Sequence, residues 1–218
     1  MSIAEATFGA GGAEPYASAL LGGEVIYLRD VRARSPRVTM DVARWNADAD
    51  DTDLTLLTSV TGPVLDVGCG PGRMVRAALG LGLHALGLDV SAAAIDLAGS
   101  LGGAYHLGSV FDAVPAAGIW QTVLLVDGNI GIGGDVRAML ERCRELLSPT
   151  GEIVIELHDD VDLDNTYVGQ LVDARGDKSA FFPWAEIGLN PLTRIAEELG
   201  LALVQSWTID GRSFCRLA

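Results

Sequence analysis

The sequence is poor in positive charge, and lysine is almost absent from it. Fifteen lysines and arginines face 29 aspartates and glutamates, which gives a formal net charge of −14, and Lys178 is the single lysine. Phosphate backbones and anionic lipid surfaces repel a chain of this charge. We therefore expect neither a nucleic-acid partner nor a membrane partner.

Cysteine and long apolar runs are also scarce. The three cysteines, Cys69, Cys143 and Cys215, lie far apart and form no CxxC pair, which argues against a disulfide framework and a zinc cluster. The first residues, MSIAEATFGAGG, have neither a basic start nor an apolar core, so we expect no signal peptide. No run of eighteen apolar residues occurs that charge or repeated glycine does not interrupt. These absences predict a cytoplasmic protein.

Apolar residues and glycine are abundant. Apolar residues make up 49% of the 218 positions, charged residues make up 20%, and 27 residues are glycine. This composition supports a substantial core and excludes intrinsic disorder. The length suits one α/β domain with additions. Residues 1–60 are irregular and rich in charge, whereas residues 61–218 alternate short apolar runs with helical patterns, so we place a boundary near residue 60.

The second zone predicts strands that alternate with helices. The expected strands are 63–67, 83–90, 104–107, 123–126 and 152–157, and the expected helices are 74–81, 91–98, 135–147 and 191–199. Between the fifth strand and the last helix we expect a polar loop of about thirty residues. The final eighteen residues form two β runs joined by Asp210-Gly211, a strong hairpin signal. Such alternation predicts a parallel sheet with an antiparallel strand added by the hairpin.

A glycine cluster follows the first strand of this zone. In the segment VLDVGCGPGR, Gly68, Gly70 and Gly72 stand where the strand passes into a helix. Ligands of open α/β sheets bind at the carboxyl ends of strands, and glycines let the backbone approach them closely. Asp89 ends the next strand, where a carboxylate can accept hydrogen bonds from both hydroxyls of an adenosine ribose.

Two ligand classes use this arrangement, and Asp66 separates them. A nicotinamide dinucleotide favours the spacing G-x-G-x-x-G, whereas this segment has G-x-G-x-G with Arg73 in the last position of that pattern. Asp66 would repel a pyrophosphate but can pair with a cationic amino group. S-adenosylmethionine (SAM) has an ammonium group and a ribose but no phosphate. The residues therefore favour SAM over NAD.

The segments VLDVGCGPGR and GLDVS resemble motif I and the acidic motif of the class I SAM-dependent methyltransferases, and more narrowly small bacterial members of unassigned substrate. The terminal hairpin is also similar to the antiparallel last strand of that family. The resemblance covers about residues 60–218. It implies a Rossmann-like, mostly parallel seven-stranded sheet, with residues 61–218 as the SAM-binding domain and residues 1–60 as an N-terminal helical cap over the substrate.

The resemblance also implies which residues surround the cofactor, whose product is S-adenosylhomocysteine. Asp66, Gly68, Cys69, Gly70 and Gly72 would surround the methionine part. Asp89 would hold the ribose, Val90 would pack on the adenine, and Ser109 and Val110 would flank it. The glycine-rich loop DGNIGIGG would contribute Asp127 and Asn129 to the methyl-transfer site, although it can also serve only as a connection to the next helix.

Candidates for proton transfer are few. His158 follows the fifth strand and, with Asp127, is our catalytic candidate, whereas His84 and His106 fall inside strands and suit structural roles. Cys69 suits packing better than nucleophilic attack. The acidic run from His158 to Asn165 could in principle hold magnesium, but a solvated loop is the simpler interpretation, and we predict no metal.

The first sixty residues supply candidates for the acceptor pocket. The aromatic residues outside the sheet pattern would wall a small organic acceptor or simply pack cap against core: Tyr16, Tyr27, Trp45, Phe181, Phe182 and Trp184. Five arginines between residues 29 and 44 could bind an acidic acceptor: Arg29, Arg32, Arg34, Arg37 and Arg44. We favour the alternative that they balance the nearby acids Asp41, Asp48, Asp50, Asp51 and Asp53.

The sequence thus predicts a SAM-dependent methyltransferase that acts on a small molecule. Three alternatives stay open: a protein that binds SAM without transferring its methyl group, an aminopropyl transferase, and a nicotinamide-dependent oxidoreductase. The sequence gives no indication of the acceptor, the methylated atom or the oligomeric state.

Overall fold

A computed structural model describes residues 7–9, 15–32 and 38–218 of the chain. Seven strands form the main sheet: β3 (Val64–Val67), β4 (Ala85–Asp89), β5 (Tyr105–Leu107), β6 (Trp120–Leu125), β7 (Leu147–Leu157), β10 (Leu203–Ile209) and β11 (Arg212–Leu217). Their order is β10-β11-β7-β6-β3-β4-β5. Neighbours are parallel from β7 to β5, and β11 runs antiparallel to both β7 and β10. The predicted Rossmann-like sheet with a closing antiparallel hairpin is confirmed.

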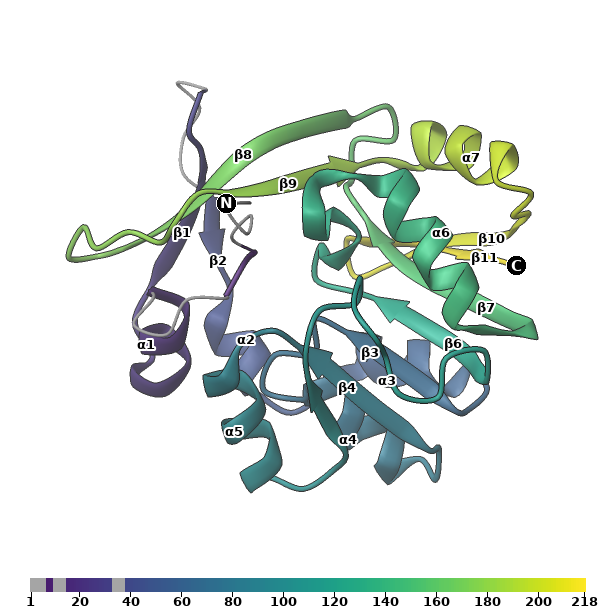
Figure 1. The fold of residues 1–218 in the computed structure, drawn as a ribbon, viewed down its shortest axis with the longest axis horizontal. Coiled ribbons are helices and arrows are strands. Elements are labelled where there is room, and N and C mark those ends of the chain that lie inside the picture. The colour runs from purple at the N-terminus through teal and green to yellow at the C-terminus, as the bar shows by residue number, and fades with distance from the viewer. Residues whose placement is uncertain (1–6, 10–14, 33–37) are drawn as a thin grey trace.

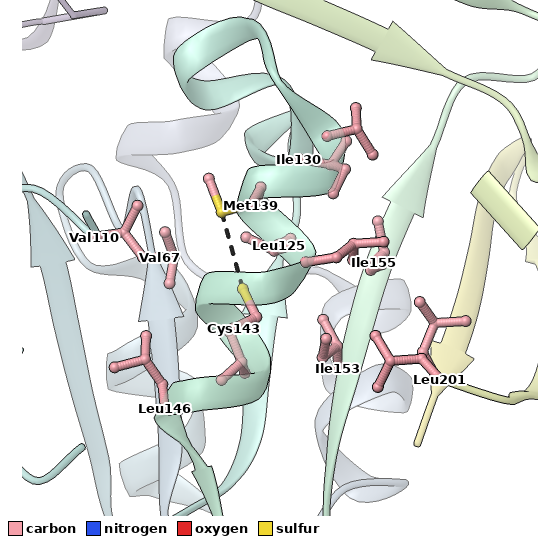
Figure 2. Close-up of a cluster of buried hydrophobic side chains, with 14 of the residues drawn as sticks. Val67, Val110, Leu125, Ile130, Met139, Cys143, Leu146, Ile153, Ile155 and Leu201 are labelled. Carbon is pink, nitrogen blue, oxygen red and sulfur yellow. Dashed lines mark hydrogen bonds between the residues drawn. The ribbon is translucent and has the colours of Figure 1, made fainter. Parts of the chain in front are cut away.

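Helices cover both faces of this sheet. They are α3 (Asp51–Thr58), α4 (Arg73–Gly80), α5 (Ala92–Ser100), α6 (Val136–Leu146) and α7 (Leu189–Glu198). Successive strand residues face opposite sides, so Ile153 and Ile155 pack with α6 and α7 while Val154 packs with α3 and α4. Figure 2 shows the first cluster, in which Met139 and Cys143 of α6 face the sheet. The result is three layers, helix–sheet–helix.

The local signals in the sequence explain where these helices begin. Ser91 caps α5, because its hydroxyl accepts a hydrogen bond from the Ala94 amide, and Asp135 caps α6 in the same way. The hairpin turn has Asp210 and Gly211 both at positive φ, 49° and 77°, which the Asp-Gly pair tolerates. None of the helices in the described part of the chain has the length and apolar character that a membrane crossing needs.

A second sheet lies over the carboxyl ends of the strands of the main sheet, where its last strand packs against the segment that follows β6. Its order is β2-β1-β8-β9, all antiparallel, from β1 (Ile26–Asp30), β2 (Val38–Met40), β8 (Asp164–Asp173) and β9 (Phe182–Ile187). Two helices complete the cap, α1 (Pro15–Gly22) and α2 (Val42–Asn46). Figure 1 shows β8 and β9 crossing above the strands of the main sheet, with α1 at one side. The cap buries an aromatic and aliphatic cluster of its own against α5.

Two expectations are corrected here. The cap is not purely helical, since β1 and β2 belong to it, and the segment expected as a polar loop forms the β8–β9 hairpin. The first half of β8 is largely exposed and only its second half is buried, so the strand has no uniform apolar alternation. The cap also draws on residues after 160 as well as on residues before 60.

Candidate functional site

A cavity lies between the cap and the carboxyl ends of β3, β4 and β6. Strand β3 is the switch point of the sheet, because the chain proceeds from it towards β4 on one side and β6 lies on the other. The space, including its open mouth, is about 910 Å³. One wall comes from the glycine-rich loop after β3 and from the ends of β4 and β6, and the other comes from the cap.

The structure brings together nearly all residues predicted to bind the cofactor. The following predicted residues line the cavity: Asp66, Gly68, Cys69, Gly70, Asp89, Val90, Ser109, Val110, Asp127 and Asn129. Gly72 does not line it. That glycine is the N-cap of α4 at φ 82°, and a Cβ there would collide with the Tyr105 ring. Its role is to turn the chain into the helix.

Asp66 is the most unusual group in the cavity wall. Its side chain lies in β3 and is 2% exposed, and neither carboxylate oxygen has a hydrogen-bond partner among the described residues. Burial raises the pKa of Asp66 to about 8, against the opposing charge of Arg73. A buried carboxylate without a partner costs free energy unless a ligand supplies one. Asp66 therefore indicates a cationic ligand group.

Asp89 lies at the end of β4 and holds the glycine-rich loop. Its Oδ2 accepts a hydrogen bond from the Gly70 amide at 2.9 Å, and its Oδ1 accepts one from the Ser91 amide at 2.8 Å. Burial raises the pKa of Asp89, and these amide hydrogen bonds oppose the rise. Each oxygen keeps a lone pair that can accept from a ligand hydroxyl.

Asn129 fastens the two ligand-facing loops together. Its Nδ2 donates to the carbonyl oxygens of Val67 and Gly68, at 2.8 and 3.0 Å. Gly68 has a φ of 71°, and a Cβ at that position would lie 2.7 Å from the same nitrogen. The loop after β6 therefore positions the loop after β3, which is a more specific role than lining the site.

An ionic network with a buried centre, Asp53 and Arg73, lies beside Asp66. It consists of three arginines, Arg44, Arg73 and Arg212, and three carboxylates, Asp53, Asp127 and Glu156, with the more exposed Asp50 at its edge. Of these residues, the sequence singled out Asp127 for catalysis. No sequence signal points to Glu156 and Arg212 as parts of a site, because the members lie on six segments spread from residue 44 to residue 212.

Asp127 is held within this network. Arg44 donates to its Oδ1 at 2.6 Å, Arg73 donates to its Oδ2, and its own amide donates to Glu156 at 2.7 Å. Burial raises the pKa of Asp127, and the charge of Arg73 opposes that rise. Hydrogen bonds from Arg212 lower the pKa of Glu156 although burial opposes them. Both carboxylate oxygens of Asp127 are thus engaged by arginines.

The cap wall of the cavity is aromatic and apolar. Phe8, Tyr16, Trp45 and Trp184 line it, and their rings contact one another mostly edge to face. The sequence predicted three of these four rings, and Phe8 was missed. Phe182 is buried behind this wall, whereas Phe181 is 55% exposed and lies outside it.

The glycine-rich loop after β6 lets strand β9 come close. It forms the 3₁₀ segment η1 (Asn129–Gly134). A Cβ on Gly131 would collide with the carbonyl oxygen of Ala185, and one on Gly134 would lie 2.8 Å from Pro183. These glycines pack the cap strand against the loop, so they contribute to the cavity by placing Trp184.

His158 lies away from this cavity. Its side chain is exposed at the end of β7 and lines a second hollow of about 640 Å³, which shares Met40, Asp127 and Trp184 with the first. Its Nδ1 accepts a hydrogen bond from the Asp160 amide at 3.0 Å. The catalytic role of His158 stays a prediction. In the described part of the chain, no three His, Cys, Asp or Glu side chains are grouped as metal ligands.

The arginines before residue 45 divide into separate roles. Arg44 pairs with Asp50 and Asp53, as expected for charge balance, and also reaches Asp127. Arg29 donates to Gln170 of β8. Arg34 and Arg37 lie outside the described residues.

Comparison with known proteins shows the fold and finds a methyltransferase-domain match over part of the chain. Residues 64–151 match the family model described as "Methyltransferase domain". No curated protein matches the sequence. Among solved structures, the chain is similar to a SAM-dependent methyltransferase from Bacteroides fragilis in complex with S-adenosyl-L-homocysteine: 18% identity, TM-score 0.74, and coverage of 93% of this chain and 92% of that one.

Two further structures have lower similarity. They are the CcbJ methyltransferase from Streptomyces caelestis, with 15% identity, a TM-score of 0.60 and coverage of 79% and 91% of the two chains, and the 1,6-didemethyltoxoflavin-N1-methyltransferase from Burkholderia thailandensis, with 16% identity, a TM-score of 0.56 and coverage of 77% and 76%. At these identities the similarity shows the fold, and the family model matches residues 64–151 of the 218.

Proposed function

We propose that the chain, which carries a class I SAM-dependent methyltransferase domain, methylates a small organic molecule held between the glycine-rich loop and the aromatic cap wall. SAM is the cofactor of this domain, and methyl transfer is its reaction. The acceptor class and the roles of individual residues are our proposal. The main observation behind the proposed site is the unpaired, buried Asp66 carboxylate in the cavity wall, which suits the ammonium group of SAM.

The residues present fit SAM. The Asp66 carboxylate would pair with the ammonium group, and Asp89 would accept hydrogen bonds from the ribose hydroxyls. Val90 and Val110 would pack against the adenine, with Ser109 beside them. When bound, SAM supplies a methyl group activated by a sulfonium centre. A dinucleotide fits less well, since a pyrophosphate near the unpaired Asp66 would meet an anion.

The aromatic wall supports a small acceptor. Phe8, Trp45 and Trp184 give the cavity an apolar face, as is typical of sites for small organic ligands. Positioning two reactants and excluding water account for much of the rate in such a site. The acidic surface makes a nucleic-acid acceptor unfavourable.

We propose that the chain's own residues act mainly by orientation. Asn129 fixes the loop that would carry the cofactor, and the arginines fix Asp127, so Asp127 would shape the site through its ion pairs. A base is required only where the acceptor loses a proton during attack. His158 is our candidate for that case, acting on an acceptor that extends into the second hollow.

Calorimetric titration with SAM, S-adenosylhomocysteine and NAD, run in parallel, tests the cofactor assignment. We expect micromolar binding of the first two and no binding of NAD. Transfer of labelled methyl from SAM to fractionated small molecules, with RNA and protein fractions as controls, then tests the acceptor class. Label in RNA or protein would refute the acceptor proposal. SAM binding with no labelled product in any fraction would favour a binding protein that transfers nothing.

A further inference from the structure

The arginines near Asp66 form ion pairs with other carboxylates and none with Asp66 itself. Arg44, Arg73 and Arg212 pair with Asp53, Asp127 and Glu156, and Asp50 joins them at the edge, whereas neither oxygen of Asp66 has a partner among the described residues. Pairing the arginines elsewhere keeps a cation-binding position available in the cavity. The question is what prevents an arginine from taking it.

Arg73 is the arginine that competes for Asp66. It begins α4, lines the same cavity and is 3% exposed, and among the charges around Asp66 its effect is the largest. However, Arg73 makes no hydrogen bond to Asp66. Its Nη1 donates to Asp53 and its Nη2 donates to Asp127, so both terminal nitrogens point to other carboxylates.

Asp53 is the centre of this arrangement. Its side chain is fully buried, and it accepts hydrogen bonds from all three arginines: from Arg44 and Arg212 at 2.9 Å each, and from Arg73. A capping box with Asp50 fixes Asp53 in the first turn of α3, because each side chain accepts from the other residue's amide. Asp53 therefore offers Arg73 a rigid partner.

We propose that Asp53 is a positioning residue for cofactor binding: with Asp127, it holds the Arg73 guanidinium away from Asp66, so that the Asp66 carboxylate stays free for the ammonium group of the ligand. This inference rests on the proposed function. It assigns Asp53 no contact with the ligand. Without Asp53, Arg73 loses one of its two carboxylates and turns to Asp66, which closes the ammonium position.

Two ligands separate this role from general damage to the fold. S-adenosylhomocysteine has the amino acid group, whereas 5′-methylthioadenosine has the same nucleoside and no ammonium. In calorimetric titration, Asp53→Asn should weaken S-adenosylhomocysteine by about tenfold or more and leave 5′-methylthioadenosine within about twofold. Asp51→Asn is the matched control, because this exposed residue lies on the same helix and has no ion pair with any described residue. It should bind both ligands as the wild type does.

Removing Arg73 tests directly whether this arginine blocks Asp66 in the Asp53→Asn variant. The double variant Asp53→Asn with Arg73→Met should recover most of the lost affinity, since no cation is left to occupy Asp66. A purely structural role for Asp53 predicts the opposite, because a second buried substitution adds damage. Arg73→Met alone should lose no more affinity for S-adenosylhomocysteine than for 5′-methylthioadenosine, because Arg73 does not contact the amino acid group, and this comparison can be made even where Asp53→Asn does not fold.

The outcomes that overturn the inference are distinct from failure of the proposed function. Unchanged affinity in Asp53→Asn, equal loss of both ligands, or no recovery in the double variant would each overturn it. Selective loss of S-adenosylhomocysteine in Arg73→Met would make Arg73 a ligand contact and would overturn it as well. If the wild type itself binds no S-adenosylhomocysteine, the proposed function fails first.

Discussion

Replacing Asp66 with asparagine should change how the stability of the protein depends on pH. Burial holds the pKa of Asp66 at about 8 in the folded protein, compared with 3.8 for an ordinary aspartate. Between these values the folded state keeps a proton that the unfolded state has lost. The free energy of unfolding therefore falls as the pH rises through this window, and it changes no further above about pH 8.

The size of the effect follows from this difference in pKa. Each pH unit inside the window costs the wild type about 1.4 kcal/mol, and Asp66→Asn has no such cost. Between pH 5 and pH 7, the wild type should lose about 3 kcal/mol of stability relative to the variant. Comparing the two proteins at both pH values cancels the contributions of all groups that they share.

Urea denaturation at the two pH values, followed by circular dichroism, measures this double difference. A value near zero would refute the reasoning, because it would mean that Asp66 has a partner or contact with water in the free protein. The same variant offers a second check. Saturating S-adenosylhomocysteine should raise the denaturation midpoint of the wild type more than that of Asp66→Asn, since only the wild type can pair with the ammonium group.

Three further changes test other parts of the site. Asp89→Ala should weaken both S-adenosylhomocysteine and 5′-methylthioadenosine by ~2–3 kcal/mol in calorimetry, since both contain the ribose, and wild-type affinity would contradict the ribose assignment. Gly131→Ala should destabilise the protein by about 1–3 kcal/mol in thermal denaturation, because the new methyl group meets the β9 backbone. Gly99→Ala, which enters open space in α5, should not destabilise it. His158→Ala should slow turnover and leave SAM affinity unchanged, and unchanged turnover would end its candidacy as a base.

The parts of the fold that the sequence predicted have short, local signals. Strand β3 and the glycines after it, the Ser91 cap and the Asp210-Gly211 turn each depend on a few adjacent residues whose chemistry permits little else. The same holds for the cavity wall that we propose for the cofactor, because short segments at the ends of two strands supply most of it. In these parts of the fold, residues that are neighbours in the sequence are also neighbours in the structure.

The parts that were missed depend on contacts between distant segments. Strand β8 has an exposed first half and pairs with β1, more than 130 residues earlier in the chain, so its polar residues resemble those of a loop. In the apolar wall, the ring of Phe8 contacts the ring of Trp184, which lies more than 170 residues later in the chain. The hydrophobic periodicity of a single segment does not predict which distant segment it will contact.

Arg44 shows how the two kinds of information combine at the site. The sequence predicted only that the arginines of this region balance nearby acids, and Arg44 does pair with Asp50 and Asp53, both within nine residues. The same guanidinium also donates to Asp127, 83 residues away, at 2.6 Å. Because Arg44 lies on cap helix α2 and Asp127 follows core strand β6, this ion pair ties the cap to the core at the cavity wall. A cap that opens to admit an acceptor must therefore either carry Arg44 with it, which leaves Asp127 to Arg73 and the more distant Arg212, or move around a fixed α2.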